Sequence, residues 1–129
     1  MERVLRLKSF QFAIRITKLS AYLKKKHHAY ELASQIFRSG TAIGALIREA
    51  ECAESRKDFI HKIHISQKES NETEYWLELS AAAGYISKKI FDSLYNDNKA
   101  LLKMLTATLT TSKRRLKSSK EQPTVNSDL

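Results

Sequence analysis

Asp58, His61 and His64 have the clearest capacity for chemistry, because they follow one another at intervals of three. A helix would present all three on one face. An aspartate three residues before a histidine also imitates the carboxylate–histidine pair of di-iron bundles. Such a centre takes two Glu-x-x-His motifs and two further glutamates, whereas this sequence has one aspartate version. We therefore expect two histidines on a solvated face, with no metal and no cofactor.

Cys52 is the only cysteine and the next candidate for a nucleophile. It lies among Glu49, Glu51 and Glu54, whereas reactive thiolates have basic neighbours. The sequence also lacks the glycine patterns of a nucleophile elbow or a phosphate-binding loop. One cysteine cannot form an internal disulfide, which fits a reducing cytoplasm. We expect a cytoplasmic protein that is not an enzyme.

Glutamates between residues 69 and 78 could suggest acid–base catalysis. A structural interpretation is stronger, because a buried charge without a partner is very costly. We expect the last two of these glutamates to be solvated and the first two to pair with arginine, within the subunit or across an interface. The residues predicted to form this polar pairing are Arg38, Arg48, Glu69 and Glu72.

The net charge of +9 is concentrated at the two ends of the chain. Residues 1–28 hold eight lysines and arginines against one acid, and residues 103–120 hold six against none. Such patterning indicates a polyanion-binding surface, although terminal lysines also serve solubility alone. Aromatic residues other than Tyr22 are not interleaved with these clusters, so we expect backbone contact without sequence readout. The predicted nucleic-acid contacts are Arg3, Arg6, Lys8, Lys113, Arg114, Arg115 and Lys117.

Helices must position these side chains, since 129 residues with three glycines and one proline offer few turns. Apolar residues recur at intervals of three and four, which predicts helices at about 9–26, 30–54, 56–84 and 92–117. Ser55 is the predicted N-cap of the third helix. Residues 1–117 form one domain in this interpretation, and 118–129 form a disordered polar tail. No run of about 18 apolar residues occurs, so we expect no contact with a membrane.

Short connections make neighbouring helices antiparallel, so the predicted fold is all-α, an up-down-up-down antiparallel four-helix bundle. In this topology the end of the fourth helix lies beside the start of the first, which joins the two basic ends of the chain. The polar segment 66–74 is expected to face the segment containing Gly40 and Gly44, whose small size allows two backbones to approach closely.

The second helix carries a second apolar stripe beside its inward one, with spacings of three, four and three. A helix that is apolar on two faces is buried on two faces. We predict that this stripe contacts another subunit; the alternative is a broad core stripe within a single bundle. The residues of the predicted interface are Phe37, Gly40, Gly44 and Ile47.

Three segments appear in a specific order: RSGTAIG followed by REAE, then KDFIHK, then KESNETEYWL. Together they resemble the four-helix-bundle family typified by proteins encoded in intervening sequences of bacterial 23S ribosomal RNA genes, over about Phe10 to Leu105. The resemblance implies a homopentamer of four-helix bundles. It also implies kinship with accessory proteins of diversity-generating retroelements, which bind a reverse transcriptase and nucleic acid through a basic surface. The family pattern has serine and asparagine where this chain has Ala42 and Leu46, so no role of those polar side chains carries over.

These observations favour a bacterial, homo-oligomeric scaffold or adaptor, pentameric by the resemblance, that associates with RNA or DNA through basic surfaces. The alternative is a protein–protein interaction module or accessory subunit that docks a reverse transcriptase or another protein and binds no nucleic acid directly. A direct binding assay separates the two hypotheses.

Overall fold

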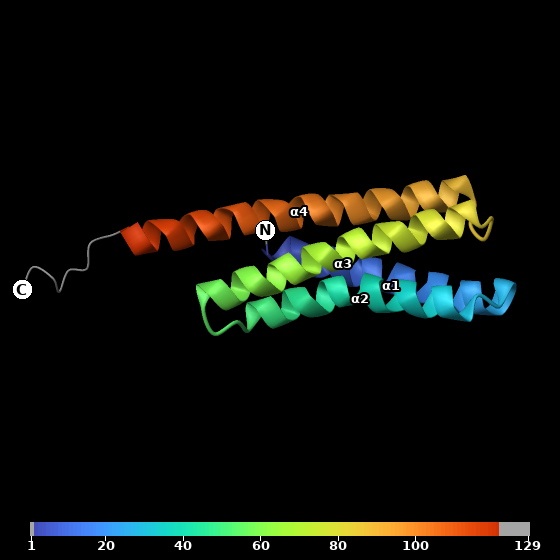
Figure 1. Cartoon of the computed structure of the whole chain (residues 1–129), viewed down its shortest axis with the longest axis horizontal. Helices are drawn as coiled ribbons and strands as arrows, with labels where there is room; N and C mark the ends of the chain where they lie inside the picture. The colour runs from blue at the N-terminus through green and yellow to red at the C-terminus, as the bar shows by residue number, and fades with distance from the viewer. Residues whose placement is uncertain (1, 122–129) are drawn as a thin grey trace, which may run out of the picture.

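The computed structural model describes residues 2–121, and within them the chain forms a four-helix bundle (Figure 1). Consecutive helices run antiparallel and pack against each other, and the last packs on the first, which closes the bundle. The predicted up-down-up-down topology is therefore confirmed. The helices are α1 (Glu2–His27), α2 (Tyr30–Glu51), α3 (Arg56–Ala82) and α4 (Lys88–Glu121).

Capping residues explain where these helices begin and end. Ser55 caps α3 as expected, since its side chain accepts a hydrogen bond from the Asp58 N–H at 3.0 Å. Ser87 does the same for the Ile90 N–H at 3.2 Å, so α4 begins at Lys88, four residues earlier than expected. Gly84, with φ of +80°, lies in the turn between α3 and α4.

Two further boundaries differ from the sequence expectation. Helix α1 begins at Glu2 rather than near residue 9, because Leu5 extends the buried stripe and is only 1% exposed. Helix α4 continues to Glu121 and so includes residues 118–121 of the predicted tail. The rest of that tail, residues 122–129, lies outside the described residues.

A layer of hydrogen-bonded polar side chains crosses the middle of the apolar core. Ser70 donates to Asn98 Oδ1 at 2.8 Å, and Asn98 Nδ2 donates back to the Ser70 carbonyl at 2.9 Å. Ser66 donates to the Ile43 carbonyl at 2.9 Å, and the hydroxyls of Thr73 and Ser39 are hydrogen-bonded at 3.0 Å. This layer explains why residues 66–74 are polar, because their buried groups are partnered inside the bundle.

The two glycines of α2 face α1 rather than α3, which corrects the predicted arrangement. A Cβ on Gly40 would lie 2.7 Å from Ile16 Cγ2, and one on Gly44 would lie 3.2 Å from Ser9 Oγ. These glycines therefore allow α1 and α2 of one subunit to approach closely.

The predicted subunit interface on α2 is consequently covered within the subunit. Gly40 and Gly44 are buried against α1, and Ile47 is 3% exposed. Phe37 alone of this set is open, at 44% exposed. Gly40, Gly44 and Ile47 therefore belong to a broad core stripe within one bundle, which was the alternative interpretation.

Across the described residues, none of the four helices combines the length and apolarity that crossing a bilayer requires.

Candidate nucleic-acid interface

Arg38 joins α2 to α3 by pairing with two glutamates. Its guanidinium lies 3.2 Å from Glu69 Oε2 and also forms an ion pair with Glu72. The indole of Trp76 donates to Glu72 Oε2 at 3.1 Å, so this carboxylate holds two side chains in place. The Arg38 side chain is 54% exposed, so the pair lies at the surface rather than in the buried setting that was expected. Its contribution to stability is correspondingly modest.

Arg48, the other arginine predicted for this pairing, has a different partner. Its guanidinium carbon lies 5.3 Å from the centroid of the Phe10 ring, an arrangement suited to a cation–π contact between α2 and α1.

The candidates for metal binding and nucleophilic chemistry are dispersed. Asp58 serves the start of α3, where its carboxylate accepts from the Glu54 N–H at 3.3 Å. His61, His64 and Cys52 are exposed. Within residues 2–121, no three His, Cys, Asp or Glu side chains come close enough together to hold a metal ion.

Four predicted contacts, Lys113, Arg114, Arg115 and Lys117, are exposed on the last turns of α4. The register of α3 against α4 is fixed by a hydrogen bond of 2.9 Å from Gln67 to Thr106. The two helices are antiparallel, so ten residues before Gln67 on α3 lie opposite ten residues after Thr106 on α4. This register places Lys57 opposite Leu116, near the C-terminus of α4.

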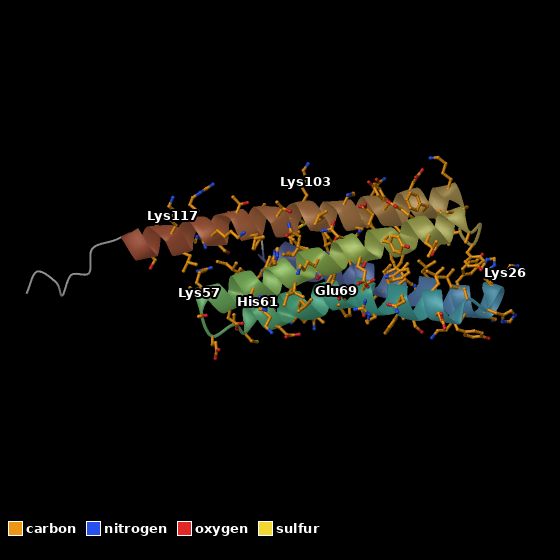
Figure 2. All side chains as sticks on the ribbon, viewed as in Figure 1. Lys26, Lys57, His61, Glu69, Lys103 and Lys117 are labelled. Carbon is orange, nitrogen blue, oxygen red and sulfur yellow. The ribbon has the colours of Figure 1, made fainter. Side chains whose placement is uncertain are left out.

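The start of α3 therefore adds two cations, Arg56 and Lys57, that the sequence analysis did not include. Both are exposed, and Figure 2 shows Lys57 and Lys117 at the same end of the bundle. The sequence could have placed these two cations beside the end of α4, because α3 begins with Arg-Lys and runs antiparallel to α4.

The N-terminal cations are only partly joined to this group. Arg15 lies 2.5 Å from Asp97, and twelve residues further along this register Arg3 comes opposite Leu109, one turn before Lys113. Figure 1 shows the last turns of α4 extending past the start of α1. Arg3 thus borders the α4 cluster.

Arg6 and Lys8 depart from the predicted patch. Arg6 pairs with Glu51 at 3.3 Å, and Lys8 borders a small cavity with Ala100 and Leu101. Leu101 precedes Lys113 by twelve residues, roughly 18 Å along the helix. The prediction of one basic patch was wrong for Arg6 and Lys8, because the C-terminal turns of α4 extend past the start of α1.

We call the resulting cluster the basic end. No acid occurs between residues 103 and 120, and Asp58 at the adjoining turn is engaged in capping. The other acids next to this cluster in the sequence are Glu2, Glu54 and Glu121, so seven cations still outnumber four acids. The exposed cations of this surface therefore produce a positive potential that attracts polyanions. The basic end consists of Arg3, Arg56, Lys57, Lys113, Arg114, Arg115 and Lys117.

Helix α1 also carries an apolar stripe that faces away from the core, which we call the outer stripe. Its members are between 42% and 57% exposed and recur at intervals of three, three and four. A second apolar face was expected on α2 and not on α1, although the same periodicity of three and four residues marks both helices. The outer stripe consists of Val4, Leu7, Phe10 and Ile14.

Comparison with known proteins finds a matching protein family and matching solved structures. A family model described as 23S rRNA-intervening sequence protein matches residues 4–107. A crystal structure of a protein with unknown function, from the S23 ribosomal protein family of Bacteroides thetaiotaomicron VPI-5482, is 45% identical, with a TM-score of 0.83. The alignment covers 84% of this chain and 97% of that one. No curated protein matches the chain. Lys113, Arg114, Arg115 and Lys117 all follow the family-matched region.

Proposed function

From the premise that the chain belongs to the 23S rRNA-intervening sequence protein family, we propose that it is a non-catalytic, self-associating scaffold that binds the phosphate backbone of RNA or DNA. The solved relative is itself a protein with unknown function, so the proposal depends on the surface of this chain. The observation that carries it is the basic end, where three helices, α1, α3 and α4, present cations to solvent.

The composition of the basic end favours phosphate over bases as its ligand. Lysine and arginine neutralise phosphates and release counterions, a term that does not depend on sequence. Phe59 is an aromatic residue next to this cluster, and the centroid of its ring lies 5.7 Å from the Arg56 guanidinium carbon. The ring is half-buried, so it offers little surface on which a base could stack. The expected mode is therefore backbone contact on single or double strands, with a steep dependence on salt.

The outer stripe of α1 supports the self-association part of the proposal. Val4, Leu7, Phe10 and Ile14 form an apolar surface that a second copy could cover. Each copy in an assembly would contribute one basic end, so a long polyanion could contact several at once and gain avidity. The family resemblance suggests five copies, and light scattering measures this number directly.

Binding of a labelled 20-nucleotide RNA and a 20-base-pair DNA at about 50 mM salt tests the nucleic-acid part. Replacing Lys113, Arg114, Arg115 and Lys117 with glutamine should weaken binding about 100-fold or more, because each lost phosphate contact removes part of the electrostatic free energy of binding. A control variant, Lys18→Gln with Lys68→Gln and Lys103→Gln, removes exposed charge from the sides of the bundle and should lose far less.

Two results would contradict the proposal. If the wild-type protein binds neither nucleic acid at about 50 mM salt, the protein–protein interaction module becomes the better explanation. If both variants lose affinity in proportion to the charge removed, the attraction is diffuse and the basic end is not a site.

A further inference from the structure

An open groove lies at the other end of the bundle, between the first turns of α2 and the last turns of α3. Its volume is about 1180 Å³, above the roughly 300–1,000 Å³ of ordinary small-molecule pockets. It is open along one side, so its dimensions suit a segment of a polymer better than a single metabolite. Residues that line this groove and matter below are His28, Tyr30, Trp76, Leu79 and Tyr85.

Three of the groove's aromatic rings contact other side chains: Trp76 and Tyr85 contact residues outside the groove, and Tyr30 contacts His28 at its edge. The Trp76 indole is fixed by its hydrogen bond to Glu72 at 3.1 Å. The Tyr85 ring is stacked on His27 with 4.7 Å between centroids. Tyr30, which is 58% exposed, has its hydroxyl 3.3 Å from His28 Nδ1. Rings positioned in advance form a stacking platform at a low entropic cost.

Lysines surround this end of the bundle. The last turn of α1 contributes Lys24, Lys25 and Lys26, and the first turn of α4 contributes Lys88 and Lys89. Figure 1 shows that the α1–α2 and α3–α4 turns share this end, and Figure 2 places Lys26 there. The neighbouring acids are Glu31, which lines the groove, Glu78, which is exposed on α3 between Trp76 and Leu79, and Asp92, which pairs with Lys88 at 2.7 Å. Positive charge is therefore in excess.

We infer that this groove binds single-stranded nucleic acid, with unpaired bases stacked on Tyr30, Trp76 and Tyr85 and phosphates near the lysines. Aromatic rings beside positive charge are the usual components of such sites, and stacking tolerates any base. A duplex keeps its bases stacked on each other, so it cannot use the rings. The chemistry thus differs from that of the basic end, and either site can fail without the other.

The sequence alone gives little sign of this site: Tyr30 follows Lys26 by four residues and Tyr85 precedes Lys88 by three, but Trp76 is far from these lysines along the chain. The fold brings rings from α2, α3 and the α3–α4 turn into one groove, at the end of the bundle that also carries the lysines of α1 and α4.

Trp76 is the only tryptophan of the chain, so its fluorescence reports on the groove directly. We expect a 12-nucleotide oligo-dT or oligo-U to quench Trp76 emission during a titration at about 100 mM salt. A 12-base-pair duplex should bind, as measured by anisotropy of a label, without quenching. Equal quenching by duplex and single strand, or no quenching when single strands are bound, would overturn the inference.

Two tyrosines provide a matched pair of variants, because Tyr30 and Tyr75 are each 58% exposed and only Tyr30 lines the groove. Tyr30→Leu keeps apolar area but removes the ring, and should weaken single-strand binding about 10-fold or more. Tyr30→Phe and Tyr75→Leu should bind like wild type, and all three variants should keep duplex binding. Equal losses for Tyr30→Leu and Tyr75→Leu would show that stacking in the groove is not the cause.

The glutamine variant of the basic end separates this inference from the proposed function. Single strands should still quench Trp76 in that variant, although duplex binding is much weaker. If quenching disappears as duplex binding weakens, the groove is not an independent site and the inference fails, while the proposed function stands.

Discussion

The polar middle of the bundle and its charged basic end are both hydrophilic in the sequence, but the first is buried in the fold and the second is exposed to solvent. In the middle, Ser70 and Asn98 are buried and satisfy each other. At the basic end, Lys113 and Arg114 are exposed to solvent. A polar group whose partners are inside the fold stabilises that fold, whereas an exposed cluster of one sign is available to a ligand. Changes in the middle should therefore alter stability, and changes at the end should alter binding.

The largest expected effect on stability is at Asn98, which is 1% exposed. Asn98→Ala leaves the Ser70 hydroxyl and carbonyl without their partner and opens a small cavity, so we expect a loss of about 2–3 kcal/mol. Urea denaturation measures this loss. Asn96→Ala changes an exposed asparagine of the same helix and should stay within about 0.5 kcal/mol of wild type. Similar values for both variants would show that the polar middle is not what stabilises the bundle.

A smaller loss of about 1–2 kcal/mol is expected for Gly40→Ala. Alanine improves helix propensity, but its Cβ would lie 2.7 Å from Ile16 Cγ2, and the branched side chain of isoleucine has little freedom to move. At Gly44 the nearest atom is Ser9 Oγ at 3.2 Å, so Gly44→Ala should be nearly neutral.

Thermal unfolding compares the two glycine variants, and light scattering follows the oligomeric state. If Gly40→Ala breaks an oligomer without changing the stability of the subunit, the contact with α1 has been assigned the wrong role.

Arg38 should matter less, because its pair with Glu69 and Glu72 is partly exposed. A double-mutant cycle with Arg38→Met and Glu72→Gln should give a coupling free energy of about 0.5–1 kcal/mol. The coupling should shrink as salt is added, since water and ions screen a surface pair. A coupling of zero at low salt would mean that the two side chains do not interact in solution.

The smallest effect concerns the ion pair between Lys99 and Glu74, whose atoms lie 2.5 Å apart. The hydrogen bond from Lys99 to Glu74 raises the pKa of this lysine above its ordinary value, and burial opposes the shift in part. A raised folded-state pKa gives stability that is complete below the ordinary lysine value of about 10.4 and is lost at higher pH.

Lys99→Met should therefore lose a few tenths of a kcal/mol at pH 8 and differ little from wild type near pH 11.5. Lys103→Met, an exposed control on the same helix, should show no such pH dependence. A difference between Lys99→Met and wild type that grows with pH would reverse the expected sign.

The spacing of apolar residues was sufficient to predict the fold, but it could not predict which neighbouring helix each side of a helix contacts. The intervals of three and four in α2 show that Gly40 and Gly44 share a stripe, but a small rotation of the helix decides whether they meet α1 or α3. The early start of α4 was missed because Ser87 was not recognised as a cap.

The basic end was partly predictable for a related reason. Lys113 and Arg114 stand out in the sequence, but the distance from Lys8 depends on how far α4 extends past α1, which only the register between helices fixes. The groove was not predictable, because its rings come from elements far apart in the chain.

The salt dependence of duplex binding tests the central claim most directly. The slope of log Kobs against log salt should become shallower by about 3–4 when Lys113, Arg114, Arg115 and Lys117 are changed to glutamine, since each lost phosphate contact removes roughly 0.9. Asn98→Ala should leave the slope unchanged at temperatures where it remains folded. An unchanged slope in the glutamine variant would show that the basic end does not contact phosphates.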